Sequence, residues 1–367
     1  MNILGRTGSR GTYMSYFNIQ SINNTAGGKA FAASKPIADT IKTLSTLGSI
    51  DMGSIDSLPN LLGRKVISYG SLANYFKQVG SGDTIFVQYP LYISYPAFLQ
   101  VVYYLRFVKR CKLVFIIHDV NSLRIDPTVG LGGMGHTNNT QRSLRNELRI
   151  LKLASGILVP TDAMRKFIEN TNKVSAKVIV FGLYEHLADS LDVPTFKNQR
   201  TMIFAGNLDK SSFLSKLNHS TFHYEIYGNE PSMFTLPENL DYRGSFPSDE
   251  LSAQFSGGFG LVWDGSSVDG ISGVMGAYLR YNSPFKASMF LASGIPVVVW
   301  KNAAIADFVS QHRLGITVNS LAEAESAIKQ ITDEQYAELT ASVRSFGLQL
   351  RQGAQFKKAL EDVLTFA

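Results

Sequence analysis

Cysteine and long apolar runs are scarce in this sequence. One of the 367 residues is a cysteine, Cys111, so an internal disulfide and a cysteine-based metal site are both excluded. Cys111 lies inside an apolar run, where we expect a buried, unreactive thiol. No stretch reaches the ~18 to 20 consecutive apolar residues that a membrane span needs, and residues 1–14 contain no apolar segment typical of a signal peptide. We therefore expect a cytoplasmic protein.

Charged residues are also few, at 17% of the chain, whereas 45% of the residues are hydrophobic. This balance excludes extended disorder and allows two sizeable cores at this length. Lys and Arg outnumber Asp and Glu by 35 to 29, which suits a phosphorylated ligand, an anionic membrane surface or another anionic partner. No dense Lys/Arg cluster alternates with aromatic residues, so we do not expect nucleic acid binding.

Motifs for a metal are missing as well. The sequence contains no Asp-x-Asp motif, and its six histidines show no ligand spacing with carboxylates. We therefore expect neither a metal nor a cofactor.

The first half of the chain alternates short apolar strands with helices, after a leader at residues 1–13 that is rich in Gly, Arg, Ser and Thr. Asp162 is the expected cap of the helix that it opens. The alternation predicts βαβ units and a doubly wound parallel sheet. Strands are expected within 15–22, 83–90, 111–120, 155–161 and 176–182, and helices within 37–48, 96–110, 140–154 and 162–170.

A polar stretch with one proline, residues 183–199, then interrupts the pattern and is expected to be a hinge. The second half repeats the alternation and ends in helices. We therefore predict an α/β protein with two Rossmann-like domains that face a cleft. The expected divisions are 14–182 for the first domain, 200–345 for the second and 346–367 for a C-terminal helix.

The loops that follow the strands of the second half are candidates for ligand binding, because open α/β sheets bind ligands beyond the carboxyl ends of their strands. Gly206 and Gly228 would let the backbone approach a ligand closely. Lys286 lies in the first turn of an expected helix, whose free N–H groups favour a phosphate. A cation there is unfavourable beside the helix dipole and needs a compensating anion, which a diphosphate would supply. The alternative is an ordinary solvated surface lysine.

The stretch around Lys286, "NSPFKASMFLASGIPVVVW", resembles the donor-binding segment of GT-B glycosyltransferases. "YRGSFPSDEL" and "FAGNLDK" resemble other elements of the same domain, and "HDVNSLR" and "LASGILVPTDAM" resemble the acceptor domain. Together they resemble a bacterial family that contains glucosyltransferases acting on serine-rich adhesins and β-1,6-galactofuranosyltransferases. Ser283 and Ser288 stand where many retaining GT-B enzymes carry acidic residues, which favours an inverting reaction.

The resemblance implies roles for individual residues. Lys286, Asn282 and the N–H groups after Pro284 would hold the sugar diphosphate without a metal. The base and ribose would lie near Gly206, Asn207, Tyr227, Gly228, Trp263 and Asp264. Core aromatic residues are the alternative for Tyr227 and Trp263.

An inverting transfer also needs a general base near the acceptor hydroxyl. Asp119 is the first choice and His118 the second, since both follow the most apolar strand of the first half; a capping role and a core histidine are the alternatives. Asn24 and Thr25 are expected to contact the acceptor or a phosphate. Glu147 and Glu185 are weaker candidates, with solvated carboxylates as the alternative.

The apolar helix at 96–110 could touch a membrane surface through its aromatic face and terminal cations. Its apolar character extends around the helix, so a buried helix or an oligomer interface is preferred, and we expect a homo-oligomer.

We therefore expect a glycosyltransferase that moves a hexose from a UDP-sugar to a glycan or glycosylated protein. UDP-glucose is the default donor, and UDP-galactofuranose or UDP-galactose the next. Two other classes stay open. A sugar-nucleotide epimerase would need acid and base groups on both sides of the sugar, and a non-catalytic partner with this fold would bind a nucleotide sugar without turnover.

Overall fold

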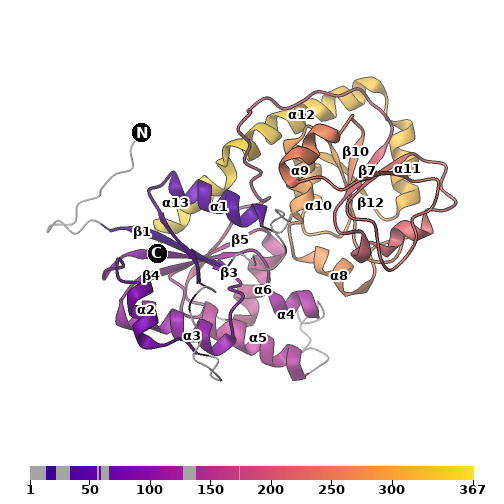
Figure 1. The fold of residues 1–367 in the computed structure, drawn as a ribbon. Coiled ribbons are helices and arrows are strands. Elements are labelled where there is room, and N and C mark those ends of the chain that lie inside the picture. Colours follow the sequence, from indigo (N-terminus) through magenta and orange to yellow (C-terminus); the bar gives the residue numbers. More distant parts are fainter. Residues whose placement is uncertain (1–13, 22–33, 56–57, 59–65, 127–137, 173) are drawn as a thin grey trace.

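The computed structural model describes residues 14–21, 34–55, 58, 66–126, 138–172 and 174–367. They form two lobes, each built around a six-stranded sheet in which every strand pair is parallel (Figure 1). Helices cover both faces of each sheet, as βαβ connections require. The predicted α/β class with two Rossmann-like halves is confirmed.

The first sheet has the order β2-β1-β3-β4-β5-β6, which reverses direction between β1 and β3. Its apolar strands are buried on both faces, as expected of a parallel sheet. The strands are β1 (Tyr16–Gln20), β2 (Ile50–Ser54), β3 (Thr84–Tyr89), β4 (Lys112–Ile117), β5 (Gly156–Val159) and β6 (Lys177–Val180).

Three short elements of this lobe were not predicted. Strand β2 and helices α2 and α4 lack a clear apolar period. The predicted helix at 96–110 becomes a π-helical segment at Tyr104–Val108. The helices are α1 (Lys35–Ser45), α2 (Tyr69–Tyr75), α3 (Tyr95–Tyr103), α4 (Asn121–Ile125), α5 (Asn138–Leu151) and α6 (Asp162–Asn172).

The predicted cap of α6 is wrong by one residue. The backbone N–H of Met164 donates to the hydroxyl of Thr161 over 3.1 Å, so Thr161 caps the helix. Asp162 instead pairs with Arg165 and Lys166 on the helix surface.

The second sheet has the order β12-β11-β10-β7-β8-β9, and its direction reverses between β7 and β10. These strands alternate with helices, as the sequence predicts for the second half. The strands are β7 (Met202–Ala205), β8 (Tyr224–Tyr227), β9 (Asp241–Gly244), β10 (Phe259–Val262), β11 (Val297–Trp300) and β12 (Gly315–Val318).

The helices of the second lobe pack around one large core. The core holds the only two tryptophans of the sequence, both buried. The helices are α7 (Ser248–Leu251), α8 (Gly273–Ala277), α9 (Phe285–Ala292), α10 (Ala306–Gln311), α11 (Leu321–Gln330) and α12 (Asp333–Gln352).

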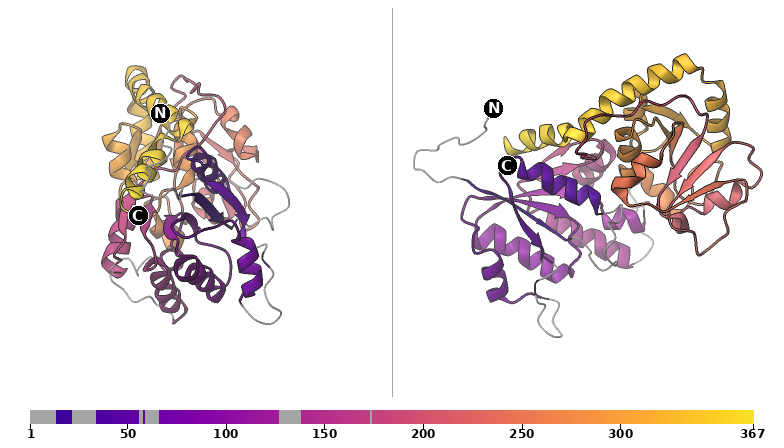
Figure 2. Two further views of the ribbon diagram at one scale, coloured as in Figure 1. Left: turned by 90° about the vertical axis from the view of Figure 1, so that its left-hand side faces the viewer. Right: turned by 45° about the horizontal axis from the view of Figure 1, so that its top comes forward.

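The chain then returns to the first lobe. Helix α12 runs along the second lobe, and α13 (Ala354–Leu364) packs on the first sheet (Figures 1 and 2). Phe356, Leu360 and Val363 repeat at helical spacing and join the core residues of β3, β4 and β5. The expected division at residue 345 falls inside α12, whereas the helix ends at Gly353, whose φ of 72° favours glycine.

Residues 181–200, which include the predicted hinge, form no regular helix or strand. They run alongside α12, where the Arg351 guanidinium donates to the backbone carbonyl oxygens of Ser190 and Asp192. None of the helices in the described part of the chain combines the length and the apolar character needed to cross a bilayer.

Candidate active site

The reversal of strand order in the second sheet sets the position of the candidate donor site. Strands β7 and β10 are neighbours, and the loops at their carboxyl ends diverge. Gly206 and Asn207 follow β7, and Trp263 and Asp264 follow β10. A doubly wound sheet binds its ligand at such a point.

Lys286 reaches this point from the first turn of α9. Its Nζ lies 3.0 Å from Oδ1 of Asp264 and donates to the carbonyl oxygen of Trp263 over 3.1 Å. It also lies 4.7 Å from the ring centre of Phe204 in β7, and an added Cβ on Gly206 would lie 4.0 Å from it. The side chain is only 16% exposed. The alternative of a solvated surface lysine is therefore wrong.

The start of α9 also carries polar atoms without a partner among the described residues. These atoms are Oδ1 of Asn282 and the hydroxyls of Ser283 and Ser288, all buried. Buried polar atoms normally have a hydrogen-bond partner. Hydrogen-bonding capacity therefore remains unused around the first turns of α9, the helix that carries Lys286.

Two glycines allow the loops to come this close. Gly206 and Gly228 have φ of 156° and 149°, and a Cβ on Gly228 would lie 2.3 Å from the carbonyl oxygen of Gly206. The loops after β7 and β8 are therefore packed backbone to backbone, and a side chain at residue 228 would separate them.

The side chains of Asn207 and Tyr227, also expected near the nucleotide, form hydrogen bonds within the second lobe. The Asn207 side chain accepts the N–H of Lys210 and caps a short 3-10 turn, Leu208–Lys210. The Tyr227 hydroxyl donates to Glu225, and its ring packs on Phe255 in the core.

The Trp263 side chain is also in the core, where its indole N–H donates to Ser267. The alternative of core aromatic residues thus holds for both rings. Trp263 takes part at the site through its backbone carbonyl.

Lys210 is an exposed residue that residue-by-residue reasoning did not select, although it lies in the quoted "FAGNLDK". It stands close enough to Asp119 of the first lobe for its charge to lower the pKa of that carboxyl. Lys210 is therefore near the candidate base, although the two residues belong to different lobes.

His118, at the carboxyl end of β4, is held by a chain of side-chain hydrogen bonds across the first sheet. The Asp51 carboxylate can only accept, so the amide of Asn18 donates to it. Gln88 then donates to Asn18, and Nε2 of His118 donates to Gln88 over 2.9 Å. This leaves Nδ1 unprotonated and without a partner among the described residues. Burial lowers the pKa of His118 to about 4, so the ring is neutral at pH 7.

Asp119 joins the two lobes. The hydroxyl of Tyr278, from the second lobe, donates to its Oδ1 over 2.9 Å and accepts the N–H of Val120 over 3.2 Å. Arg124 lies 3.4 Å from the other carboxylate oxygen. Burial raises the pKa of Asp119, and the charge of Arg124 and the hydrogen bond from Tyr278 partly oppose this rise. A raised pKa suits a general base.

Glu147 and Glu185 are structural and buried, so the alternative of solvated carboxylates is wrong. Glu147 accepts the N–H groups of Asn121 and Ser122 and caps α4. Glu185 accepts the N–H of Phe356 at the start of α13 over 2.7 Å. Burial raises the pKa of Glu185 to about 8. Asn24 and Thr25 lie outside the described residues.

One group of side chains that could ligate a metal is brought together in space, although the sequence spacing did not indicate it. The ligand atoms of His223, Glu225 and Asp241 lie within 4.8 Å of one another. Arg243 already pairs with Asp241 at 2.6 Å, and the cluster lies at the amino ends of β8 and β9. It is thus one strand length, roughly 13 Å, from the loops of the donor site.

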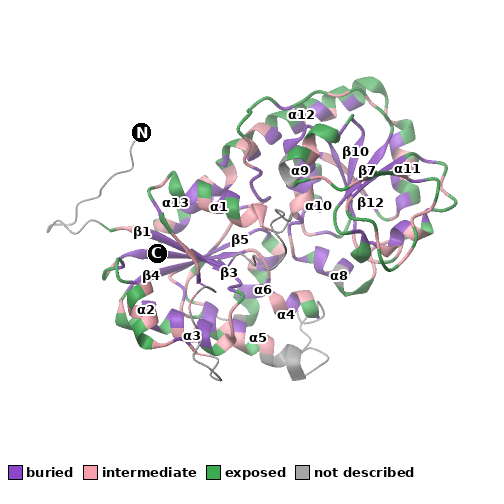
Figure 3. Ribbon diagram, in the orientation of Figure 1, coloured by how far each residue is buried: buried purple, intermediate pink, exposed green. Residues whose placement is uncertain are grey.

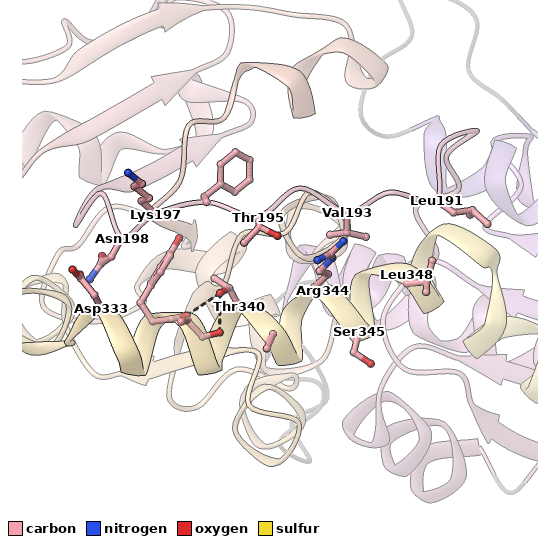
Figure 4. Close-up of a pocket in the computed structure, with 14 residues that line it drawn as sticks. Leu191, Val193, Thr195, Lys197, Asn198, Asp333, Thr340, Arg344, Ser345 and Leu348 are labelled. Atoms are coloured by element: carbon pink, nitrogen blue, oxygen red, sulfur yellow. Dashed lines mark hydrogen bonds between the residues drawn. The ribbon is translucent and has the colours of Figure 1, made fainter.

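A separate groove lies on the far side of the second lobe, between residues 191–198 and α12 (Figure 4). Its volume is about 920 Å³. Tyr336, which lines it, bonds to both backbone groups of Gly258, just before β10 begins. The groove is therefore at the amino ends of the strands, away from Lys286.

Solved structures with a similar fold are glycosyltransferases. Sucrose-phosphate synthase from Thermosynechococcus elongatus aligns with a TM-score of 0.65 at 12% identity, covering 96% of this chain and 99% of the other. Anabaena HepE, solved in complex with UDP and glucose, aligns with a TM-score of 0.57 at 14% identity, covering 95% of this chain and 100% of the other. At such low identity the likeness shows the fold, which is GT-B.

Curated relatives are similar over most of their length. The β-1,6-galactofuranosyltransferase WbbI of Escherichia coli K12 is 26% identical over 306 residues, 82% of this chain and 85% of the relative. Glucosyltransferase 3 of Streptococcus gordonii is 27% identical over 289 residues, 78% of this chain and 80% of the relative.

Two family models match, one in each half of the chain. The N-terminal domain model of glucosyltransferase 3-like proteins matches residues 19–183, and the C-terminal domain model matches residues 202–363. Together they cover most of both lobes and confirm the resemblance seen in the sequence. The chain belongs to the glucosyltransferase 3-like family of GT-B glycosyltransferases.

Proposed function

We propose that this protein transfers a hexose from a UDP-sugar to a hydroxyl of a glycan or glycosylated protein, with inversion and without a metal. The observation that carries the proposal is the position of Lys286, which places a largely buried ammonium group between the loops of β7 and β10 at the start of α9. A diphosphate bound there would accept hydrogen bonds from Lys286 and from the helix N–H groups.

In the proposed reaction, the acceptor oxygen attacks the anomeric carbon from the face opposite UDP. Asp119 takes the proton of the attacking hydroxyl, and its raised pKa favours this step. The bond from the anomeric carbon to the diphosphate oxygen breaks, and UDP leaves with the bonding electrons. Lys286 and Lys210 would stabilise the charge that develops on UDP, which is the part a metal plays in other transferases.

His118 is less suited to be the base, because its depressed pKa makes it a weak proton acceptor. We propose that it orients the neighbouring backbone instead. Tyr184 supports this role, since its ring stacks on the His118 ring at 5.7 Å and its hydroxyl donates to the His118 carbonyl oxygen.

The donor sugar is proposed from the relatives. The name of Glucosyltransferase 3 makes UDP-glucose the first donor we propose, and the name of WbbI makes UDP-galactofuranose the second. Calorimetric titration of UDP, UDP-glucose, UDP-galactose and UDP-galactofuranose, with EDTA present, tests the proposal.

Binding of UDP and of one UDP-sugar in EDTA is the expected result. The donor that binds is then incubated with candidate acceptors, and the anomeric configuration of the product is read by NMR. Binding that requires a divalent cation, or a product with retained configuration, would contradict the mechanism.

A further inference from the structure

The outer surface of the first lobe exposes several large apolar side chains. Tyr69 is 65% exposed, Phe107 58%, Val108 54% and Tyr103 47%. They lie on α2 and on the continuous helix of α3 and its π-helical segment, in the lower part of the lobe in Figure 3. Isolated exposed apolar residues are ordinary, but a group of them needs an explanation.

Ring contacts order the aromatic side chains on this helix. Tyr103 and Phe107 stack on each other with ring centres 5.3 Å apart. Tyr69 packs edge-on against the buried Tyr104 at 5.6 Å, which holds α2 beside the same helix. The opposite face of α3, which includes Phe98 and Val101, is buried in the core of the lobe. The helix therefore presents apolar residues both to the core and to solvent.

Basic residues predominate in this part of the sequence, and Lys77 and Arg110 are exposed. Residues 57–118 contain seven basic residues and a single acid, Asp83. Asp83 is buried, and its carboxylate accepts the backbone N–H groups of Ser15 and Gly80, so it does not offset the surface charge. The seven basic residues are Arg64, Lys65, Lys77, Arg106, Lys109, Arg110 and Lys112.

The neighbouring helix extends the same charge. Helix α5 contacts α3, and Arg149 and Lys152 at its end are exposed. The one acid in α5, Glu147, is buried and caps α4. Residues 66–118 and α5 thus combine exposed aromatic and aliphatic side chains with exposed cations, and none of their described acids is exposed.

We propose that this surface docks on an anionic lipid bilayer. Tyr103, Phe107 and Val108 would enter the headgroup region, and cations such as Lys77 and Arg110 would bind acidic headgroups. A symmetric contact between two copies would bring the cations of both copies together. Their repulsion disfavours a second copy of the chain as the partner of this surface. The inference goes beyond the transfer reaction and does not depend on it.

The topology keeps such docking compatible with an open cleft. Helix α3 starts after the carboxyl end of β3 and runs back to the amino end of β4, so Tyr103 and Phe107 lie toward the amino edge of the sheet. Asp119 lies at the carboxyl edge, between the lobes. The first lobe would contact the bilayer while the second lobe stays away from it (Figure 1).

Co-sedimentation of the full chain with vesicles tests the proposal. One vesicle type contains phosphatidylcholine alone and the other adds phosphatidylglycerol. The test variants are Tyr103→Ser with Phe107→Ser, and Lys77→Glu with Arg110→Glu. The matched controls are Met233→Ser, which changes a 79% exposed side chain of the other lobe, and Lys216→Glu in the same lobe as Met233. Melting temperature checks that each variant is folded.

We expect the protein to bind vesicles that contain phosphatidylglycerol, and to bind less as salt rises. Each double variant should bind at least about tenfold more weakly, while both controls bind as the unchanged chain does. Equal binding to both vesicle types, no binding at all, or double variants that bind normally would overturn the proposal. A double variant that instead loses self-association in light scattering would assign this surface to a contact between copies and also overturn the proposal.

Discussion

The Nζ of Lys286 lies 3.0 Å from Oδ1 of Asp264, across the point where the strand order of the second sheet reverses. The sequence raised the question of which anion offsets a lysine at a helix N-terminus. In the structure, Asp264 provides that anion and holds the ammonium group between the loops that follow β7 and β10. We propose that a bound diphosphate shares the same ammonium group.

Replacement of Asp119 by Asn is expected to lower kcat by roughly 10² to 10⁴, because the group that takes the acceptor proton is removed. UDP affinity should change little, since Asp119 is on the other lobe. Steady-state kinetics and UDP titration measure both quantities. A variant with normal kcat would show that another group is the base.

Tyr278→Phe removes a hydrogen bond that stabilises the Asp119 carboxylate and lowers its pKa. The pKa of Asp119 should therefore rise, and the acid limb of the pH profile of kcat/KM should move to higher pH. The conservative change keeps the ring in the core. An unshifted acid limb would mean that Asp119 does not titrate in the reaction.

Glu185 makes stability depend on pH. Its pKa is raised to about 8 in the folded protein, from 4.5 for the free side chain. The stabilisation it provides is complete below pH 4.5 and is lost as pH rises toward 8. Glu185→Gln keeps an oxygen that can accept the N–H of Phe356 and should remove this loss. We expect the variant to melt at a higher temperature than the unchanged chain at pH 8.5 and to differ little at pH 4.5.

Gly228→Ala is expected to destabilise the second lobe by more than ~1 kcal/mol, because the new methyl group would meet the Gly206 carbonyl oxygen. UDP binding should weaken with it, since the loops after β7 and β8 would separate. Gly70→Ala in α2 is the control, because nothing lies within 4 Å of its added Cβ. That change should stabilise the protein by roughly 0.5 to 1 kcal/mol. If the two variants melt alike, the close packing of the loops is not important.

The sequence predicts the apolar strands of both sheets better than it predicts the short elements. Buried strands such as β4 and β11 are apolar throughout and are bounded by turn residues, so local composition is sufficient. Strand β2 carries Asp51 and Gly53, and only its pairing with β1 makes it a strand. The pairing of α13 with the first lobe is likewise a tertiary contact that helical spacing cannot reveal.

In the candidate site, too, some residues can be found from the sequence, whereas their partners are seen only in the structure. Glycines at strand ends and a lysine at a helix start can be found from spacing, and these residues do meet in the structure. Partners are not visible in the sequence, because Tyr278 and Asp119 are 159 residues apart. The structural roles of Glu147 and Glu185 were likewise not visible, because each caps a helix from another segment of the chain.

The most direct test of the account is UDP titration, with EDTA present, into the unchanged chain, Lys286→Ala and Lys301→Ala. Lys301 is an exposed lysine of the same lobe. A charge-assisted hydrogen bond contributes about 1.5 to 3 kcal/mol, so we expect Lys286→Ala to bind UDP roughly 10- to 100-fold more weakly and Lys301→Ala to bind it normally. If Lys286→Ala binds UDP as tightly as the unchanged chain, Lys286 does not hold the diphosphate and the proposed donor site is wrong.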